Sequence, residues 1–132
     1  MKFLIVDDDE RIALLITKIL SKHGSCTVAH NGDEAIELFR EQHGASEPFD
    51  AVFMDIMMPG MDGHEVVKQL RSLEKEMGVS DIHTFKLIMI SALSDTKNVC
   101  KSFFHGYADA YIAKPDIKAK LLDELRNIKL ID

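Results

Sequence analysis

Acidic, hydroxyl and basic side chains stand at the ends of four short apolar stretches of this 132-residue chain. Asp7 and Asp8 follow the first stretch, and Asp55 follows another one just before a turn. Ser91 and Lys114 follow two further stretches. Three carboxylates that meet in space repel one another unless a cation joins them, and Mg²⁺ prefers such hard oxygen ligands. With a hydroxyl and an ammonium group beside that metal to bind an anion, this set suits a carboxylate that accepts a phosphoryl group.

The apolar stretches themselves have the length of β-strands. They are short and mostly apolar, as are strands of a parallel sheet that is covered on both faces. We expect five strands, at residues 2–6, 26–29, 51–54, 86–90 and 110–113. The carboxyl ends of parallel strands meet at one edge of an open sheet, so the chemically active side chains are expected to converge there.

Segments with helical periodicity lie between the apolar stretches. The first of them carries one apolar stripe of an amphipathic helix, formed by Ile12, Leu15, Ile16, Ile19 and Leu20. Asn31 and Asp62 are each followed three residues later by Glu, which is typical of a capping box. Asp9, Ser94 and Asp116 are further candidate N-caps. The alternation predicts an α/β fold, doubly wound as (βα)5, with helices on both faces of a five-stranded parallel sheet.

The composition is that of one globular domain, with 46% hydrophobic and 29% charged residues. A formal net charge of −6 argues against a nucleic-acid partner, because phosphates are bound by basic surfaces. The apolar stretches are too short to cross a membrane, and the first residues do not read as a signal peptide. We therefore expect a cytoplasmic protein that binds no membrane.

Four motifs give the sequence its resemblance to a known family. They are VDDD at 6–9, MDIMMPGMDG at 54–63, ISA at 90–92 and YIAKP at 111–115, each at the end of an expected strand. Together they resemble the receiver domain of two-component response regulators, of the stand-alone chemotaxis-regulator type, over nearly the whole chain. The resemblance implies a flavodoxin-like sheet with strand order 2-1-3-4-5. It also implies one receiver domain over residues 1–132, without an output domain.

The resemblance also implies the acceptor and the metal ligands. Asp55 would be the phosphoacceptor, which forms an aspartyl phosphate. Asp7 and Asp8 would hold Mg²⁺ (or Mn²⁺), with Asp8 as the more direct ligand. Asp55 itself and the backbone carbonyl of Met57 would complete the protein's ligands to the metal.

Further roles follow from the same resemblance. Lys114 and the Ser91 hydroxyl would each bind a phosphoryl oxygen. Ser91 and Tyr111 would form a switch, in which the aromatic ring turns inward when the hydroxyl moves. Met57 and Leu93 stand two places after the acceptor and after the switch hydroxyl, where receivers tune attack by water. Both are apolar, so we expect slow self-dephosphorylation.

The implied function is a phosphorylation-activated switch of a histidine-kinase phosphorelay, which catalyses only its own phosphorylation and slow dephosphorylation. Its expected partners are a sensor histidine kinase or a phosphotransfer protein, and a downstream protein. The downstream protein would bind the face formed by the fourth helix, fifth strand and fifth helix, which carries Phe103, Phe104, Tyr107 and Tyr111. We expect a monomer or a weak dimer that depends on phosphorylation.

One alternative is a phosphohydrolase of the haloacid-dehalogenase type, because Asp7 and Asp9 imitate its DxD motif after an apolar strand. That family needs more chain for its second acidic motif and its cap, and it leaves Asp55 without a role. A pseudo-receiver that acts only as a scaffold is a third interpretation, which the presence of all five site residues disfavours.

Overall fold

The computed structural model describes residues 1–58, 60, 62–92 and 108–132. In chain order its elements are β1 (Lys2–Val6), α1 (Glu10–Leu20), β2 (Ser25–Ala29), α2 (Gly32–Gly44), β3 (Ala51–Asp55), α3 (Gly63–Glu76), η1 (Asp81–His83), β4 (Lys86–Ser91), β5 (Ala110–Ala113), η2 (Lys114–Asp116) and α5 (Ile117–Asn127), where η marks a one-turn 3-10 helix. Several predictions fall outside the described residues: the fourth helix with its N-cap Ser94, and the side chains of Leu93, Phe103, Phe104 and Tyr107.

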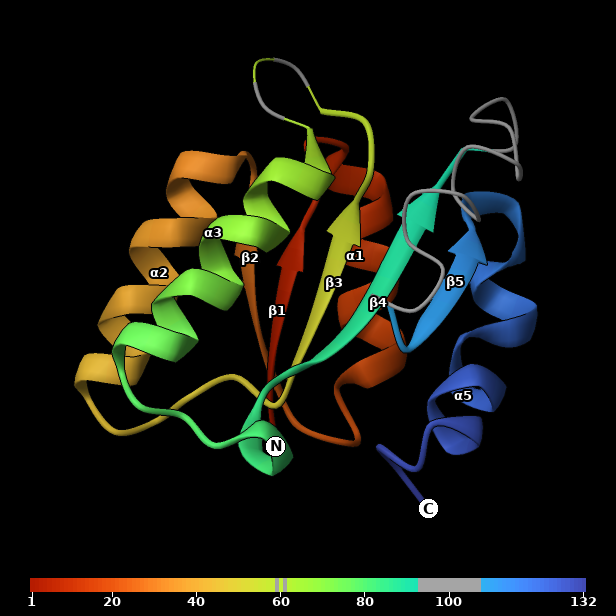
Figure 1. Cartoon of the computed structure of the whole chain (residues 1–132). Coiled ribbons are helices and arrows are strands. Elements are labelled where there is room, and N and C mark those ends of the chain that lie inside the picture. The colour runs from red at the N-terminus through yellow and green to blue at the C-terminus, as the bar shows by residue number, and fades with distance from the viewer. Residues whose placement is uncertain (59, 61, 93–107) are drawn as a thin grey trace.

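The strands form one parallel sheet in the order β2-β1-β3-β4-β5 (Figure 1), with helices around it, which confirms the predicted fold class and strand order. Two strands run one residue further than expected, because Asp55 pairs with Ile90 and Ser91 pairs with Ala113. Both of these polar residues are therefore held inside the sheet ladder rather than in a loop.

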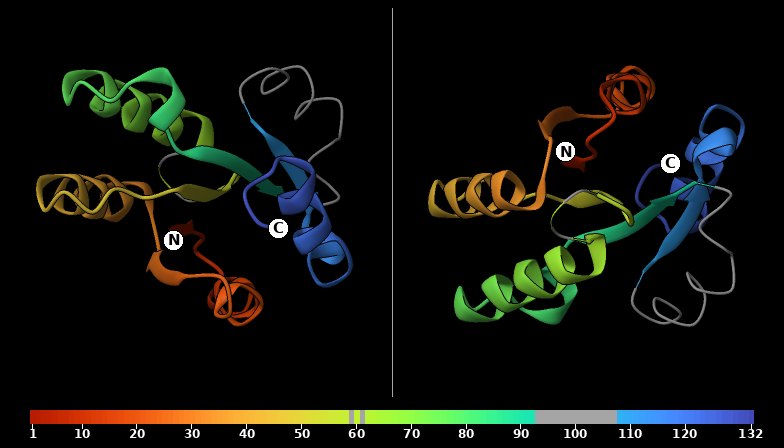
Figure 2. Two further views of the ribbon diagram at one scale, coloured as in Figure 1. Left: turned by 90° about the horizontal axis from the view of Figure 1, so that it is seen from below. Right: turned by 90° about the horizontal axis from the view of Figure 1, so that it is seen from above.

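The two faces of the sheet carry separate cores. Alternation along β1 sends Leu4 and Val6 to the face covered by α2 and α3, and Phe3 and Ile5 to the face covered by α1 and α5. Figure 2 shows these two helix pairs on opposite sides of the sheet. Because both faces are covered, the central strands are apolar nearly throughout and expose almost nothing to water.

Three helices begin at the predicted acidic or amide side chains. Asp9 Oδ1 accepts the Arg11 N–H at 2.9 Å, Asn31 Oδ1 accepts the Glu34 N–H at 2.8 Å, and Asp62 Oδ1 accepts the Glu65 N–H at 2.9 Å. Each cap residue has extended backbone, which aims its side chain at the first helical turn. These bonds satisfy amide groups that have no partner within their own helix.

Asp116 occupies the N-cap position of α5, as predicted, but it does not cap the helix with its side chain. Its backbone is helical, with φ −95° and ψ −1°, and its side chain makes no capping hydrogen bond. The reason is that η2 runs directly into α5 and holds Asp116 in helical backbone, whereas a capping residue typically has extended backbone. The Asp116 carboxylate instead lies 3.8 Å from Lys120 Nζ, one turn along the helix.

A buried charge ties the end of α3 to the start of β4, which the sequence did not predict. Glu74 is 2% exposed, and its carboxylate accepts Arg71 Nη1–H and the Phe85 N–H, both at 2.9 Å. The Arg71 guanidinium in turn lies 3.7 Å above the centre of the Phe85 ring. Both Glu74 oxygens are thus paired, as a buried carboxylate requires.

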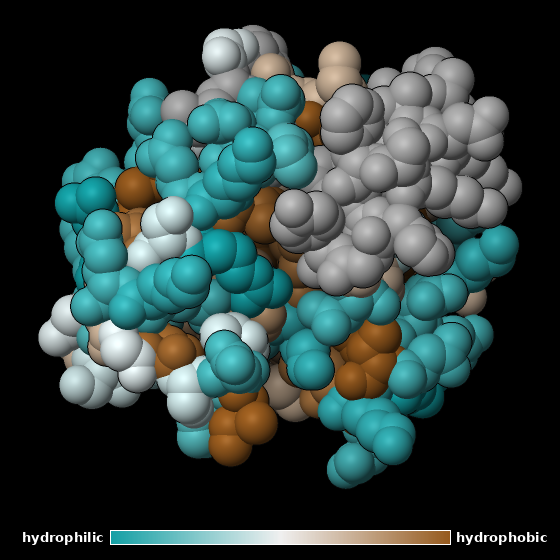
Figure 3. Space-filling view, viewed as in Figure 1, coloured by the Kyte–Doolittle hydropathy of each residue, from teal (hydrophilic) through white to brown (hydrophobic). Residues whose placement is uncertain are grey.

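Outside the grey region, the face seen in Figure 3 is mostly hydrophilic, with small and separate hydrophobic areas. Large apolar residues exposed on the described surface include Leu14, Met57 and Ile82. Within the part of the chain that the structure describes, no helix has the length and apolar character needed to span a membrane.

Candidate functional site

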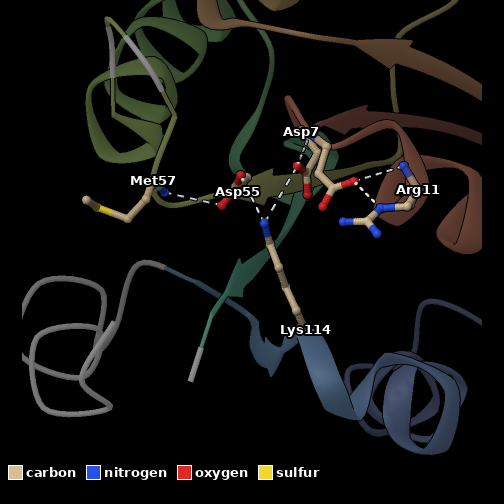
Figure 4. A network of polar contacts seen from close by, with 6 residues as sticks. Asp7, Arg11, Asp55, Met57 and Lys114 are labelled. Atoms are coloured by element: carbon tan, nitrogen blue, oxygen red, sulfur yellow. Dashed lines mark hydrogen bonds and ion pairs between the residues drawn. The ribbon is translucent and has the colours of Figure 1, made fainter. Parts of the chain in front are cut away.

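The strand ends bring four of the predicted site residues to one edge of the sheet. Asp7 directly follows β1, Asp55 is the last residue of β3, and Lys114 directly follows β5. Ser91 is the last residue of β4, the strand between β3 and β5. Asp55 therefore lies beside β1 on one side and β4 on the other, at the centre of this edge (Figures 1 and 4).

Three carboxylates meet at this edge. Asp7, Asp8 and Asp55 each offer an oxygen within 4.8 Å of the others. Asp7 and Asp55 are each only 1% exposed, whereas Asp8 is exposed to solvent. The cluster is therefore open to an ion on the Asp8 side and closed on the side of the sheet.

The two oxygens of Asp7 have different surroundings. Asp7 Oδ1 accepts the Asp9 N–H at 2.8 Å. Asp7 Oδ2 is buried and has no hydrogen-bond partner among the described residues. A buried carboxylate oxygen without a partner is costly, so its position beside two more carboxylates indicates a place for a cation.

Lys114 supplies the positive charge that the structure itself places there. Its Nζ lies 3.4 Å from Asp55 Oδ2 and 3.7 Å from Asp7 Oδ1, and Figure 4 shows it pointing between the two acids. The other acceptor oxygen, Asp55 Oδ1, accepts the Met57 N–H at 3.2 Å. Each oxygen of Asp55 thus has a donor from a different part of the chain.

Burial and repulsion dominate the electrostatics of the two inner acids. Burial, followed by the charge of Asp7, raises the pKa of Asp55 from 3.8 to about 7, although Lys114 opposes this change. Burial likewise raises the pKa of Asp7. Burial on its own would lower the pKa of Lys114, but the charges of Asp55 and Asp7 outweigh it and raise that pKa. The single ammonium of Lys114 therefore does not offset the burial and mutual repulsion of the two acids.

The residues present fit the expected Mg²⁺. Three carboxylates supply hard oxygen ligands, the Asp7 oxygen without a partner is free to bind, and Asp8 is accessible from solvent. The Met57 N–H donates to Asp55. The expected role of the Met57 carbonyl as a metal ligand stays a prediction.

The two expected switch residues lie on neighbouring strands. Ser91 is half-buried at the end of β4, opposite Ala113. Tyr111 pairs with Met89 in the sheet ladder and is half-buried against the core beneath α2 and α3. Its ring therefore occupies an intermediate position, neither fully exposed nor fully buried, and the switching role stays a prediction.

Asp9 differs from the other acids of its run. It caps α1, and its Oδ1 lies 3.6 Å from Arg11 Nε. The structure thus gives Asp9 a capping role and places Asp55 at the centre of the cluster, so the phosphohydrolase alternative with Asp7 and Asp9 is not supported.

Comparison with known proteins agrees with this geometry. The response regulator receiver domain family matches residues 3–126 of the chain. The sensory/regulatory protein RpfC of Xanthomonas campestris is 32% identical over 128 residues, which are 97% of this chain and 16% of that protein. The response regulator MprA of Mycobacterium avium is 32% identical over 127 residues, 96% of this chain and 50% of that protein. The chain thus spans half or less of the length of these relatives.

A solved structure is similar over almost the whole chain. It is the receiver domain of the histidine kinase CKI1 from Arabidopsis thaliana in complex with Mg²⁺ and BeF₃⁻, with 26% sequence identity and a TM-score of 0.78. The match covers 98% of this chain and 90% of that one. Sequence, fold and the clustered acids at the strand ends lead to one conclusion: this chain belongs to the response regulator receiver domain family of two-component signalling.

Proposed function

We propose that the chain is a Mg²⁺-dependent switch in which Asp55 accepts a phosphoryl group from a phosphohistidine of a partner protein. One observation carries this proposal. A buried carboxylate at the centre of the sheet edge lies 3.4 Å from a lysine ammonium and within 4.8 Å of two more carboxylates. A merely structural acid would not need so many charges gathered around it.

The proposed reaction moves one phosphoryl group. A carboxylate oxygen of Asp55 forms a bond to phosphorus while the bond from phosphorus to the donor's imidazole nitrogen breaks, and the imidazole leaves with that electron pair. Asp55 must be deprotonated to attack, although its pKa is raised to about 7. Bound Mg²⁺ would favour the carboxylate and neutralise charge on the phosphoryl oxygens.

The chain's own groups hold the acceptor and receive the charge. The Met57 N–H fixes one Asp55 oxygen, and Lys114 lies beside the other. When the phosphoryl group arrives, Lys114 is expected to turn from the carboxylate to a phosphoryl oxygen, which carries more charge. Asp7 and Asp8 would hold the metal, with Asp55 and the Met57 carbonyl completing its protein ligands.

The signal would leave through a change of shape. The Ser91 hydroxyl would move toward a phosphoryl oxygen, and Tyr111 would turn from its half-buried position into the space behind β4. The phosphoryl group would bias an equilibrium that already exists without it. The downstream protein would then bind the face that includes β5 and α5, while the chain remains a monomer or forms a weak dimer in the cytoplasm.

The test uses a small acyl phosphate with Mg²⁺ and measures intact mass. The wild type should gain one phosphoryl group, and Asp55→Asn should gain none. Asp123→Asn is the matched control, because Asp123 on α5 has a side chain that is 73% exposed. Phosphorylation of Asp55→Asn in equal yield, or of the wild type in excess chelator, would contradict the proposal. A wild type that gains no phosphate would favour the scaffold interpretation.

A further inference from the structure

Gly63, the first residue of α3, lies against the backbone of Asp55. A Cβ atom at this position would lie 2.3 Å from the Asp55 carbonyl oxygen and 2.9 Å from Met54 Cγ. Real Cβ atoms essentially never come closer than 3.0 Å to a heavy atom of a residue that is not a chain neighbour. Here the nearest such atom belongs to the backbone, which cannot easily move away. The close approach of α3 to β3 therefore requires glycine at this position.

The peptide that links Asp55 to Ile56 is held from two sides. Its N–H donates to the Ile90 carbonyl of β4 at 3.0 Å, and its carbonyl oxygen faces Gly63. The next carbonyl, that of Ile56, accepts the Gly63 N–H at 2.8 Å. Since a peptide unit is planar, these contacts fix how the chain leaves Asp55 and so restrict where its side chain can point.

Small displacements at this point matter because the contacts of Asp55 are short and come from distant elements. Its carboxylate contacts Lys114 after β5 at 3.4 Å and the Met57 N–H at 3.2 Å. Reacting groups must be held within about 0.5 Å of the productive geometry. A side chain at position 63 would force α3 and Asp55 apart by several tenths of an ångström, which is enough to disturb both contacts.

We propose that Gly63 is a positioning residue for the phosphoacceptor: its missing side chain lets α3 lock the Asp55 peptide in the orientation that the reaction needs. This inference rests on the proposed role of Asp55 and deepens it. Gly63 touches no reacting atom, so its effect passes through the strand end that carries Asp55.

Gly24 provides a matched control for the test. A Cβ atom there would lie 2.4 Å from the Met1 carbonyl oxygen and 2.9 Å from the Phe3 ring, which is nearly the same steric conflict. Gly24 comes just before β2, at the end of the sheet opposite Asp55 (Figure 1). Gly63→Ala and Gly24→Ala therefore introduce similar strain at opposite ends of the molecule.

Two measurements are made on the whole chain of each variant. The first is hydrogen exchange of the Ile56 amide, which should speed up by about tenfold or more in Gly63→Ala and stay unchanged in Gly24→Ala. The second is the phosphorylation rate per folded molecule at saturating acyl phosphate and Mg²⁺. It should fall by roughly 10- to 100-fold in Gly63→Ala, as expected for a misplaced reacting group, and stay within about twofold of wild type in Gly24→Ala.

If Gly63→Ala is partly unfolded, sucrose at one concentration is added to all proteins, because excluded osmolytes favour the folded state. Unchanged Ile56 exchange in Gly63→Ala would overturn the inference, as would equal phosphorylation rates of the two variants. Should the wild type accept no phosphate, the proposed function fails, and the Ile56 exchange alone decides whether Gly63 positions Asp55.

Discussion

At the scale of single residues, Asp55 combines a desolvated charge with a neighbouring cation. It is 1% exposed, and Lys114 contacts both Asp55 and Asp7. The same ammonium thus holds two acids that repel each other. The Lys114 ammonium can therefore move to a newly arrived phosphoryl oxygen. The move leaves no buried charge without a partner, provided that a metal ion then neutralises Asp7 and Asp55.

Met57 is expected to slow hydrolysis of the phosphorylated form. Met57 stands two residues after the acceptor and is 61% exposed, and its N–H donates to an Asp55 oxygen. A thioether cannot orient an attacking water well, whereas an amide can, through a hydrogen bond of about 1 kcal/mol. Met57→Asn should therefore speed loss of the phosphoryl group by about fivefold, since 1.36 kcal/mol corresponds to a factor of ten.

The decay is followed by intact mass after the donor is removed. Leu14→Asn serves as the control, because Leu14 on α1 is a similarly exposed apolar residue, at 55%. Equal decay in the two variants would show that Met57 does not shield the acceptor.

At the scale of elements, the backbone at a helix start decides whether an acidic or amide side chain caps it. Asn31 and Asp62 have extended backbone and bind the amide three residues on. Asp116 has helical backbone, because η2 runs directly into α5 and supplies its own backbone bond. Three similar sequence signals thus lead to two different local structures.

This difference predicts different effects on stability. Asn31→Ala should lower the free energy of unfolding by about 0.5–2 kcal/mol, because it removes a capping hydrogen bond. Asp116→Ala should lower it by only about 0.2–0.5 kcal/mol, since it removes just an exposed ion pair with Lys120. Urea denaturation at constant pH compares the two variants. A loss for Asp116→Ala as large as that for Asn31→Ala would mean that Asp116 caps α5 after all.

At the scale of the whole molecule, the acidic edge costs stability. The sheet forces Asp7 and Asp55 together because β1 and β3 are neighbours in the ladder. The folded protein therefore holds protons, or a cation, that the unfolded chain would release. Mg²⁺ is expected to raise the melting temperature for this reason, and replacing a clustered acid by Asn should do the same without metal.

The stability of the metal-free protein should fall as the pH rises toward neutrality. In the folded state the pKa of Asp55 is about 7, against 3.8 for the ordinary group. Between these values the folded protein binds more protons than the unfolded chain, so the free energy of unfolding decreases with increasing pH. The contribution is fully present below about pH 3.8 and is lost as the pH passes through about 7. The raised pKa of Asp7 acts in the same direction.

Urea midpoints measured in chelator across this pH range test the prediction. Asp55→Asn should flatten the decrease, while Asp123→Asn, which replaces an exposed acid, should leave it in place. If the stability of Asp55→Asn decreased with pH at the same slope as that of the wild type, other groups would be responsible for the decrease.

Much of the architecture could be predicted from the sequence because it depends on near neighbours. Strand alternation, helical stripes and the caps Asp9, Asn31 and Asp62 involve residues a few positions apart. The bounds of β1 and β5 agree with the predicted ones, and those of the other three strands differ by one residue at one end. Asp7, Asp8, Asp55, Ser91 and Lys114 could be predicted to converge because each stands at or just after a strand end, and parallel strands share an edge.

Tertiary structure decided what depends on residues far apart in the chain. The raised pKa of Asp55 arises from burial under elements that meet only in the fold, and from Asp7, which is distant in sequence. The oxygen of Asp7 without a partner, the buried hydrogen bond of Glu74 to the Phe85 N–H and the close approach of Gly63 to Asp55 have the same origin. Desolvation and backbone packing are set by what surrounds a group in space, so the sequence determined which residues lie at the site, and only the fold determined their charge and orientation.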